Sequence, residues 1–302
     1  MEWLWIPVTV WAAFAQTIRN AAQRSLTASL GTLGATLVRF LYGLPFALLW
    51  LAAVAAWSGE PLPETSAVFW GWVALGGLSQ VAATALLLAA MQERNFALGV
   101  AYSKTEILQL AVFAVVFLGD PLGPGAAFAV IAGTLGVMLL SPVDRERPLR
   151  TLLAGWTSRA SLLGIASGAG FALAAVGYRG AALALPGAGF LMAAATALAA
   201  AQFLQTIALG GWLALREPAT IGRALREWRR SLLAGFMGAA ASAGWFTAFA
   251  LEPAAHVRTL GLVELVFSYA VSRKLFRERL TRLEVAGMSL LALGVAAIAL
   301  AG

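Results

Sequence analysis

Two glutamates within apolar stretches are the residues of this sequence best placed to do chemistry. Glu106 lies inside the apolar stretch 97–118 and Glu264 inside 255–276. An ionisable side chain near the centre of a lipid bilayer costs about 2.5–3.5 kcal/mol or more, so it needs a counter-charge, a wet cavity or a function. Such a carboxylate can bind a substrate ammonium group, carry a proton or bond neighbouring helices, and all three roles stay open here.

Three basic groups lie in similar surroundings and are candidate counter-charges or ion-coupling groups. Arg39, in the stretch 30–57, is the expected partner of one of the two acids. Lys104 precedes Glu106 by two residues, about 200° around a helix, so we expect it to pack against another helix or to reach the membrane surface. His256, near the end of its stretch, suits an interfacial position as well as a ligand.

Polar and aromatic side chains recur on the same helical faces. Tyr102, Glu106, Gln109 and Phe113 follow the spacing of one face of a helix, which we orient toward a central cavity. Thr84 and Ser242 could instead bond only to their own helices. The expected cavity lining is Tyr102, Glu106, Gln109, Gln80, Thr84, Trp11, Phe14, Phe171, Tyr178, Ser242, Trp245 and Glu264.

The elements that carry these residues are predicted to be membrane-spanning helices. Hydrophobic residues make up 61% of the 302 residues and charged residues only 12%, too few polar groups to cover a soluble protein of this size. Each crossing needs about 20 apolar residues. We therefore predict an all-α integral membrane protein with ten transmembrane helices, near 3–19, 30–57, 66–91, 97–118, 123–141, 161–178, 188–214, 231–251, 255–276 and 281–301.

The ten predicted helices divide into two similar halves. One constant shift in numbering aligns Gly77 with Gly235, Thr84 with Ser242, and Glu106 with Glu264. We predict a five-helix repeat over 1–141, a connecting loop over 142–160 and a second five-helix repeat over 161–302. An odd number of helices per half gives the halves opposite orientations, an inverted repeat around a central cavity that suits alternating access.

Basic residues predict the orientation of the chain. Most of the 21 Lys and Arg residues fall in connections after odd-numbered helices, including Arg19 and Arg24 after the first. Arg179 and Arg258 fall in connections on the other side. By the positive-inside rule the basic connections are cytoplasmic, which predicts a multi-pass protein of the bacterial inner membrane with both termini in the periplasm. The net charge of +7 is then explained by membrane topology and lipid contact, with no nucleic acid as partner.

Several classes of activity are excluded from the prediction. The chain has no cysteine and a single histidine, so thiol chemistry and histidine-based metal clusters are not expected. Phosphate-binding loops and hydrolase motifs are also missing from the sequence. We expect neither a cofactor nor an enzyme activity.

Two similar sequence blocks resemble the drug/metabolite transporter superfamily, EamA type. The first runs from Phe117 to Leu122 and 131–137, and the second from Phe276 to Leu280 and 291–295. The resemblance implies ten helices around a central cavity and export of amino acids or other small metabolites. It also implies a structural role for the turn acids Asp120 and Glu278. Family members commonly have cytoplasmic termini, which differs from the orientation predicted by charge.

The predicted function is secondary export of a small metabolite, with an aromatic or other hydrophobic amino acid as substrate and protons as the candidate coupling ion. One alternative is a broad-specificity drug or lipid-linked sugar exporter, which should open sideways to lipid. A second alternative is a non-transporting membrane scaffold, for which we would expect a dry, packed interior. An intramembrane enzyme would need a convergent acid–base or metal set that this composition does not favour.

Overall fold

The fold is taken from a computed structural model of the chain, which describes residues 3–106, 108–109, 131–132, 135–136, 139, 158–251, 257 and 260–301. Helices and no strands occur within these ranges. The helices are α1 (Trp5–Leu41), α2 (Leu44–Ser58), α3 (Ala67–Glu93), α4 (Phe96–Ser103), α8 (Arg159–Leu183), α9 (Phe190–Arg216), α10 (Pro218–Arg226), α11 (Trp228–Leu251), α13 (Val263–Lys274) and α14 (Arg282–Ala301). The predicted helix 123–141 and connection 142–160 lie almost wholly outside the described residues.

Four helical stretches of the described chain are long and apolar enough to cross a membrane. They cover Trp5–Ser58, Ala67–Glu93, Arg159–Leu183 and Phe190–Arg216. Side-chain caps fix where two helices begin, since Ser66 accepts from the backbone N–H of Phe69 at 3.2 Å and Asn95 from that of Leu98 at 2.9 Å. The prediction of an all-α protein that contains helices long enough to span a membrane is therefore confirmed.

The predicted connection between the first two apolar segments is wrong, because residues 20–29 continue the helix. Helix α1 breaks only at Gly31, which has φ 71° and ψ 173°, a conformation open essentially to glycine. The polar side chains that suggested a loop find partners in the bundle. Gln23 donates to the carbonyl of Ala35 at 2.9 Å, and Arg24 pairs with Glu278. Residues on the two sides of Gly31 therefore lie side by side, and the chain continues from residues 32–41 of α1 into α2.

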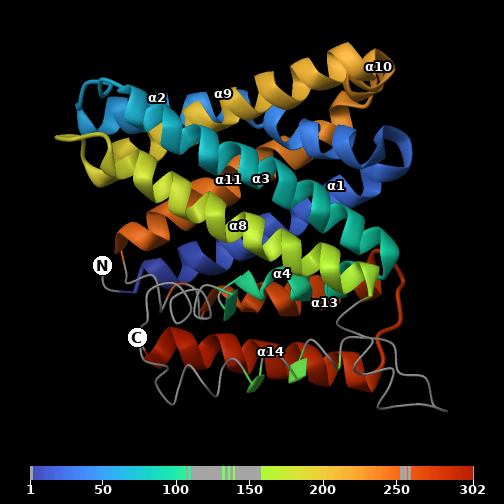
Figure 1. Cartoon of the computed structure of the whole chain (residues 1–302). Helices are drawn as coiled ribbons and strands as arrows, with labels where there is room; N and C mark the ends of the chain where they lie inside the picture. Colours follow the sequence, from blue (N-terminus) through green and yellow to red (C-terminus); the bar gives the residue numbers. More distant parts are fainter. Residues whose placement is uncertain are drawn as a thin grey trace.

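The bundle is organised around two extensive helix pairs. α3 packs against α8, and α1 packs against α11 (Figure 1). α4 contacts α8 and α13, while α14 lies at the outside of this group. α2 and α9 lie together on the other side. Glycine allows the closest approaches, since a methyl group at Gly177 would lie 2.5 Å from the backbone nitrogen of Gly76.

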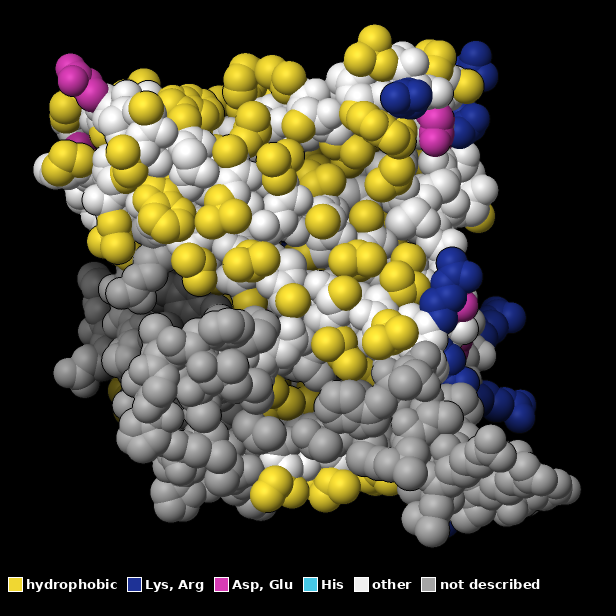
Figure 2. All heavy atoms as spheres, in the orientation of Figure 1, with side chains coloured by type: hydrophobic (Ala, Val, Ile, Leu, Met, Phe, Trp, Pro, Cys, Tyr) yellow, Lys and Arg dark blue, Asp and Glu magenta, His cyan; other side chains and the backbone are white. Residues whose placement is uncertain are grey.

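The two ends of the bundle differ in charge. Lys and Arg side chains gather along one edge, which we call the basic end, while apolar side chains cover most of the described face between the edges (Figure 2). Ion pairs Arg24–Glu278 and Arg94–Glu284 join α1 and the start of α4 to the α13–α14 region. Beside them pack Leu26, Leu88, Met91, Phe96 and Leu98, each no more than 1% exposed. The basic end is thus closed by packed apolar side chains.

The described connection from α2 to α3, at the opposite end, carries acids and no basic residue. Glu60 and Glu64 lie in the connection from α2 to α3, and the backbone N–H of Gly189, before α9, donates to Glu60 at 2.8 Å. Helix α1 begins and α14 ends at this edge (Figure 1). We call it the opposite end.

The break at Gly31 yields a stability prediction. Gly31→Ala forces a side chain into the left-handed region, so the free energy of unfolding should fall by about 1–3 kcal/mol, measured by thermal unfolding in detergent. Gly211→Ala is the matched control, because Gly211 lies inside α9 with open space around it and should be neutral or stabilising by up to about 1 kcal/mol. Equal behaviour of the two variants would contradict the assigned role of Gly31.

Candidate functional site: a polar cavity within the bundle

A cavity of about 980 Å³ lies between helices α1, α3, α4, α8, α9, α11 and α13. Much of its wall is alanine, including Ala174, Ala193, Ala194, Ala197 and Ala201. These short side chains leave the space open. The cavity runs from a polar cluster, where α4 ends and α13 begins beside α1, to Leu185 and Ala188, in the connection from α8 to α9 at the opposite end.

Glu264 is the centre of the polar cluster. Its side chain is 1% exposed and forms an ion pair with Lys104. Gln16 donates to its Oε2 at 2.7 Å, and Asn20 Nδ2 lies 3.4 Å from its Oε1. The Nε1–H of Trp245 donates in turn to Gln16 Oε1 at 3.1 Å. Four helices, α1, α11, α13 and the end of α4, thus meet at one carboxylate.

Lys104 packs against another helix and acts as a counter-charge, as expected, but it also lies in the same cavity as both glutamates, which the helical angle did not predict. Helix α4 ends at Ser103 and residues 104–105 form a turn, so the helical angle between Lys104 and Glu106 does not apply. Lys104 reaches Glu264, and Glu106 lines the same cavity. The Lys104–Glu264 ion pair joins one residue from each of the two predicted halves.

Arg39 is also placed differently from the prediction. Its Nη1 donates to the hydroxyl of Thr84 at 2.9 Å, and it makes no ion pair with an acid among the described residues. Arg19 lies beside it, with Nε and Nη2 bonded to Asn20 Oδ1 at 3.2 and 2.7 Å. Both arginines line the cavity and are 3% exposed. The counter-charge of Glu264 is therefore Lys104 and not Arg39.

A second polar group joins α3, α8 and α9. The hydroxyl of Tyr178 donates to Gln80 Oε1 at 2.8 Å, and Gln205 Nε2 lies 2.9 Å from that oxygen and 3.0 Å from the Tyr178 oxygen. Gln205 Nε2 also donates to the carbonyl of Gly77 at 3.1 Å. All three side chains line the cavity. They provide hydroxyl and amide groups on the wall facing the charged cluster.

Most of the residues expected at the cavity do line it. Glu106, Gln80, Phe171, Tyr178, Ser242, Trp245 and Glu264 are on the wall, as are Arg39 and Lys104. Ser242 also donates to the carbonyl of Gly238 in its own helix at 3.0 Å, the bond that the alternative interpretation foresaw.

Other expected lining residues lie elsewhere. Tyr102 is 1% exposed and packs against Gly164, because the turn after Ser103 breaks the predicted stripe. Gln109 donates to the carbonyl of Ile165 at 2.9 Å, and Thr84 is held by Arg39. Trp11 and Phe14 are 46% and 38% exposed and lie away from the wall. His256 lies outside the described residues, as do Phe113 and Asp120.

Sequence reasoning missed six polar residues of the wall, namely Gln16, Arg19, Asn20, Ser103, Gln202 and Gln205. Arg19 and Asn20 were overlooked because the first helix was ended at residue 19 and its polar end assigned to a loop, whereas Gln16 lies within that predicted helix. Gln202 and Gln205 lie within a predicted apolar helix. A usable signal existed for these two, since amides three residues apart in an alanine-rich membrane helix share a face.

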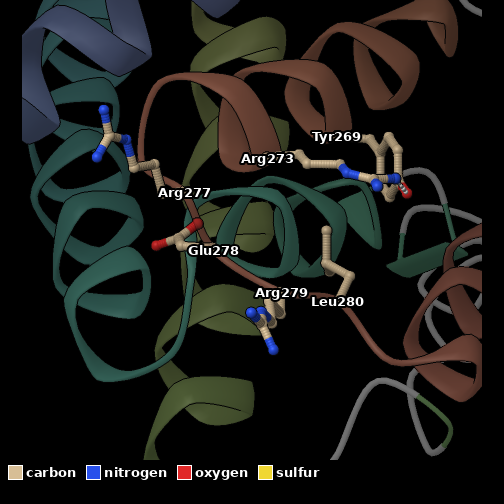
Figure 3. A pocket seen from close by; sticks show the side chains of 6 residues that line it. All are labelled: Tyr269, Arg273, Arg277, Glu278, Arg279 and Leu280. Carbon is tan, nitrogen blue, oxygen red and sulfur yellow. Dashed lines mark hydrogen bonds between the residues drawn. The ribbon is translucent and has the colours of Figure 1, made fainter.

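A smaller hollow of about 530 Å³ lies at the basic end (Figure 3). Arg273 lies across Tyr269, donating to its hydroxyl at 3.2 Å, while Arg277 points away from the other labelled side chains (Figure 3). Arg277 has φ 55°, and the turn brings Glu278 to the backbone N–H of Phe96 at 3.0 Å. Glu278 thus caps α4 and confirms the structural role expected for it. The larger cavity remains the candidate site, because polar groups converge there from several helices.

Comparisons with known proteins show a similarity of fold and do not show a family or a function. No protein-family profile matches the chain, and no curated protein matches it. A solved structure, described only as a crystal structure of a protein, matches 100% of this chain and 97% of its own, with a TM-score of 0.61 and 18% sequence identity. At that identity the similarity indicates a shared fold over the whole chain.

The ion pair in the cavity gives a stability prediction. Lys104→Gln leaves Glu264 buried without its cation, so we expect the free energy of unfolding to fall by about 3 kcal/mol, the low end of the range for breaking a buried pair. Lys104→Gln combined with Glu264→Gln should recover most of this loss, because no charge is then left unpaired. Thermal unfolding of the two single variants and the double variant measures the coupling, and additive losses would contradict the pairing.

Proposed function

We propose that this protein is a secondary transporter of the drug/metabolite transporter superfamily, EamA type, which exports small metabolites across the bacterial inner membrane. The substrate class is amino acids, with aromatic or other hydrophobic side chains favoured. The observation that carries the proposal is the cavity of about 980 Å³ with charged and amide groups on an otherwise apolar wall. A packed scaffold has no reason to keep such a space.

The unequal ends of the bundle support alternating access. The cavity extends to the α8–α9 connection at the opposite end, whereas apolar packing and the Arg24–Glu278 and Arg94–Glu284 pairs close the basic end. A transporter in one of two states is expected to have this asymmetry. With the basic end cytoplasmic by the charge rule, the cavity faces the periplasm, and both chain ends lie on that side.

The pattern of helix contacts is consistent with two interchangeable halves. The predicted repeat relates α1 to α8 and α3 to α11. The α1–α11 and α3–α8 pairs would then be two copies of one contact, and they are the two most extensive in the bundle. The aligned glycines also make corresponding approaches, since Gly77 meets α9 at Gln205 and Gly235 meets the α1–α2 junction at Gly43.

Flux measurements test the proposal. Purified protein in liposomes loaded with radiolabelled amino acids should release at least one of them faster than protein-free liposomes, with and without a pH gradient. A full panel of amino acids and small hydrophobic metabolites with no protein-dependent flux would contradict the proposed function.

The two cavity acids are predicted to take part in transport. Because both line the cavity, the double variant Glu106→Gln, Glu264→Gln should reduce efflux by about tenfold or more while the protein remains folded. Glu227→Gln is the matched control, since Glu227 lies at the C-terminal end of surface helix α10 and pairs only locally with Arg230. Unchanged efflux in the double variant would remove both acids from the mechanism.

The absence of cysteine from the sequence allows a test of sidedness. Ser242→Cys places one thiol on the cavity wall, and exposed Ser25→Cys places one at the basic end. In right-side-out vesicles, a membrane-impermeant thiol reagent should label Ser242→Cys and leave Ser25→Cys unmodified. Labelling of the second variant alone would reverse the proposed orientation.

A further inference from the structure

We infer that Arg19 and Arg39 form the subsite that binds the negatively charged group of the substrate, and that this group is a carboxylate. The inference rests on the proposed function in that it places a substrate in this cavity. It begins from the position of the two side chains. A methyl group at Gly238 would lie 3.2 Å from Cγ of Arg39 and 3.3 Å from Cδ of Arg19, so both side chains pass the same point of α11.

Neither guanidinium forms a direct ion pair with an acid among the described residues, and Arg19 is linked to Glu264 only through the side chain of Asn20. Arg39 donates to the hydroxyl of Thr84, with its guanidinium carbon 5.2 Å from the ring centre of Phe40. Arg19 donates to the neutral amide oxygen of Asn20. Both are 3% exposed and line the cavity. The nearest described acid, Glu264, already pairs with Lys104. Two buried cations side by side with no direct ion pair are costly, so they favour an anion between or beside them.

The charges on the wall indicate a single negative charge. Among the described residues, the cavity is lined by the cations Arg19, Arg39 and Lys104 and by the acids Glu106 and Glu264, so described cations exceed described acids by one. Lys104 and Glu264 already form an ion pair. One carboxylate would balance the wall, whereas a phosphate dianion would exceed what is needed.

The shape of the site suits a carboxylate attached to an apolar group. Guanidinium groups bind planar carboxylates through two parallel hydrogen bonds. Phe171 and Phe246 line the same cavity, and Phe246 lies 6.4 Å from the ring centre of Tyr178 in an edge-to-face arrangement. These rings provide contacts for a hydrophobic side chain.

Equilibrium binding in detergent tests the subsite without any need for transport. The probes are 3-phenylpropionate, phenethylamine and phenyl phosphate, which share a ring and differ in charged group. We expect 3-phenylpropionate to bind at least about tenfold more tightly than the other two, measured by calorimetry. Equal binding of the acid and the amine would overturn the inference, and tighter binding of phenyl phosphate would overturn the carboxylate assignment.

Variants connect the selectivity to the arginines. Arg39→Gln should weaken 3-phenylpropionate binding by about tenfold or more, and Arg39→Lys by less, since it keeps the charge and loses the two-point hydrogen bond. Arg159→Gln is the control, because Arg159 is 79% exposed and pairs with Glu93 away from the cavity. Gly238→Ala keeps both charges but presses on both side chains, so it should weaken binding even if Arg39→Gln fails to fold. Unchanged affinity in Arg39→Gln or in Gly238→Ala would overturn the inference.

Efflux of L-phenylalanine from proteoliposomes separates this inference from the proposed function. If the protein exports L-phenylalanine but binds the acid and amine probes equally, the carboxylate subsite is contradicted and the proposed transport function is supported. If the protein binds carboxylates selectively but transports no solute, the proposed transport function is contradicted and the subsite is supported.

Discussion

The structure depends on keeping charged side chains inside an apolar helix bundle. Five of them, Arg19, Arg39, Lys104, Glu106 and Glu264, line one cavity, and of these the Lys104–Glu264 pair is the clearest internal balance. Each would be too costly in contact with lipid. The cavity and its polar side chains therefore require each other, since the charges need hydration or a ligand and the space needs groups that water can bind.

Small residues make this arrangement possible. Alanine forms much of the cavity wall, so the space is not filled, while glycines let α3 approach α8 and α11 approach the α1–α2 junction elsewhere. Close contact at these crossings replaces the packing that larger side chains would provide. Packing is concentrated instead at the basic end, where Leu26, Leu88, Met91 and Phe96 are buried beside two ion pairs. The larger cavity therefore extends toward the opposite end and not toward the packed side chains of the basic end.

The sequence predicted the all-α fold class and part of the site. Composition and segment length identify an all-α chain, and polar groups in apolar segments pointed to Glu106, Glu264, Gln80 and Tyr178, all on the cavity wall. Two errors came from backbone breaks. Helix α1 was ended at its polar residues although Gly31 breaks it, which hid Arg19 and Asn20. Helix α4 was continued through the turn at Lys104, which misplaced Lys104, Tyr102 and Gln109. Helical periodicity locates a side chain only while the helix is unbroken.

The central claim is that the cavity changes the end to which it opens. Pulsed electron–electron double resonance tests this claim. Because the chain has no cysteine, pairs of cysteines can be introduced at exposed sites and spin-labelled. One pair, Trp57 and Leu183, lies at the opposite end, and the other, Ser25 and Arg282, at the basic end. With saturating transported substrate, we predict that the distance distribution shortens for the first pair and lengthens for the second. Two distributions that both stay fixed, in protein that still transports, would contradict the account.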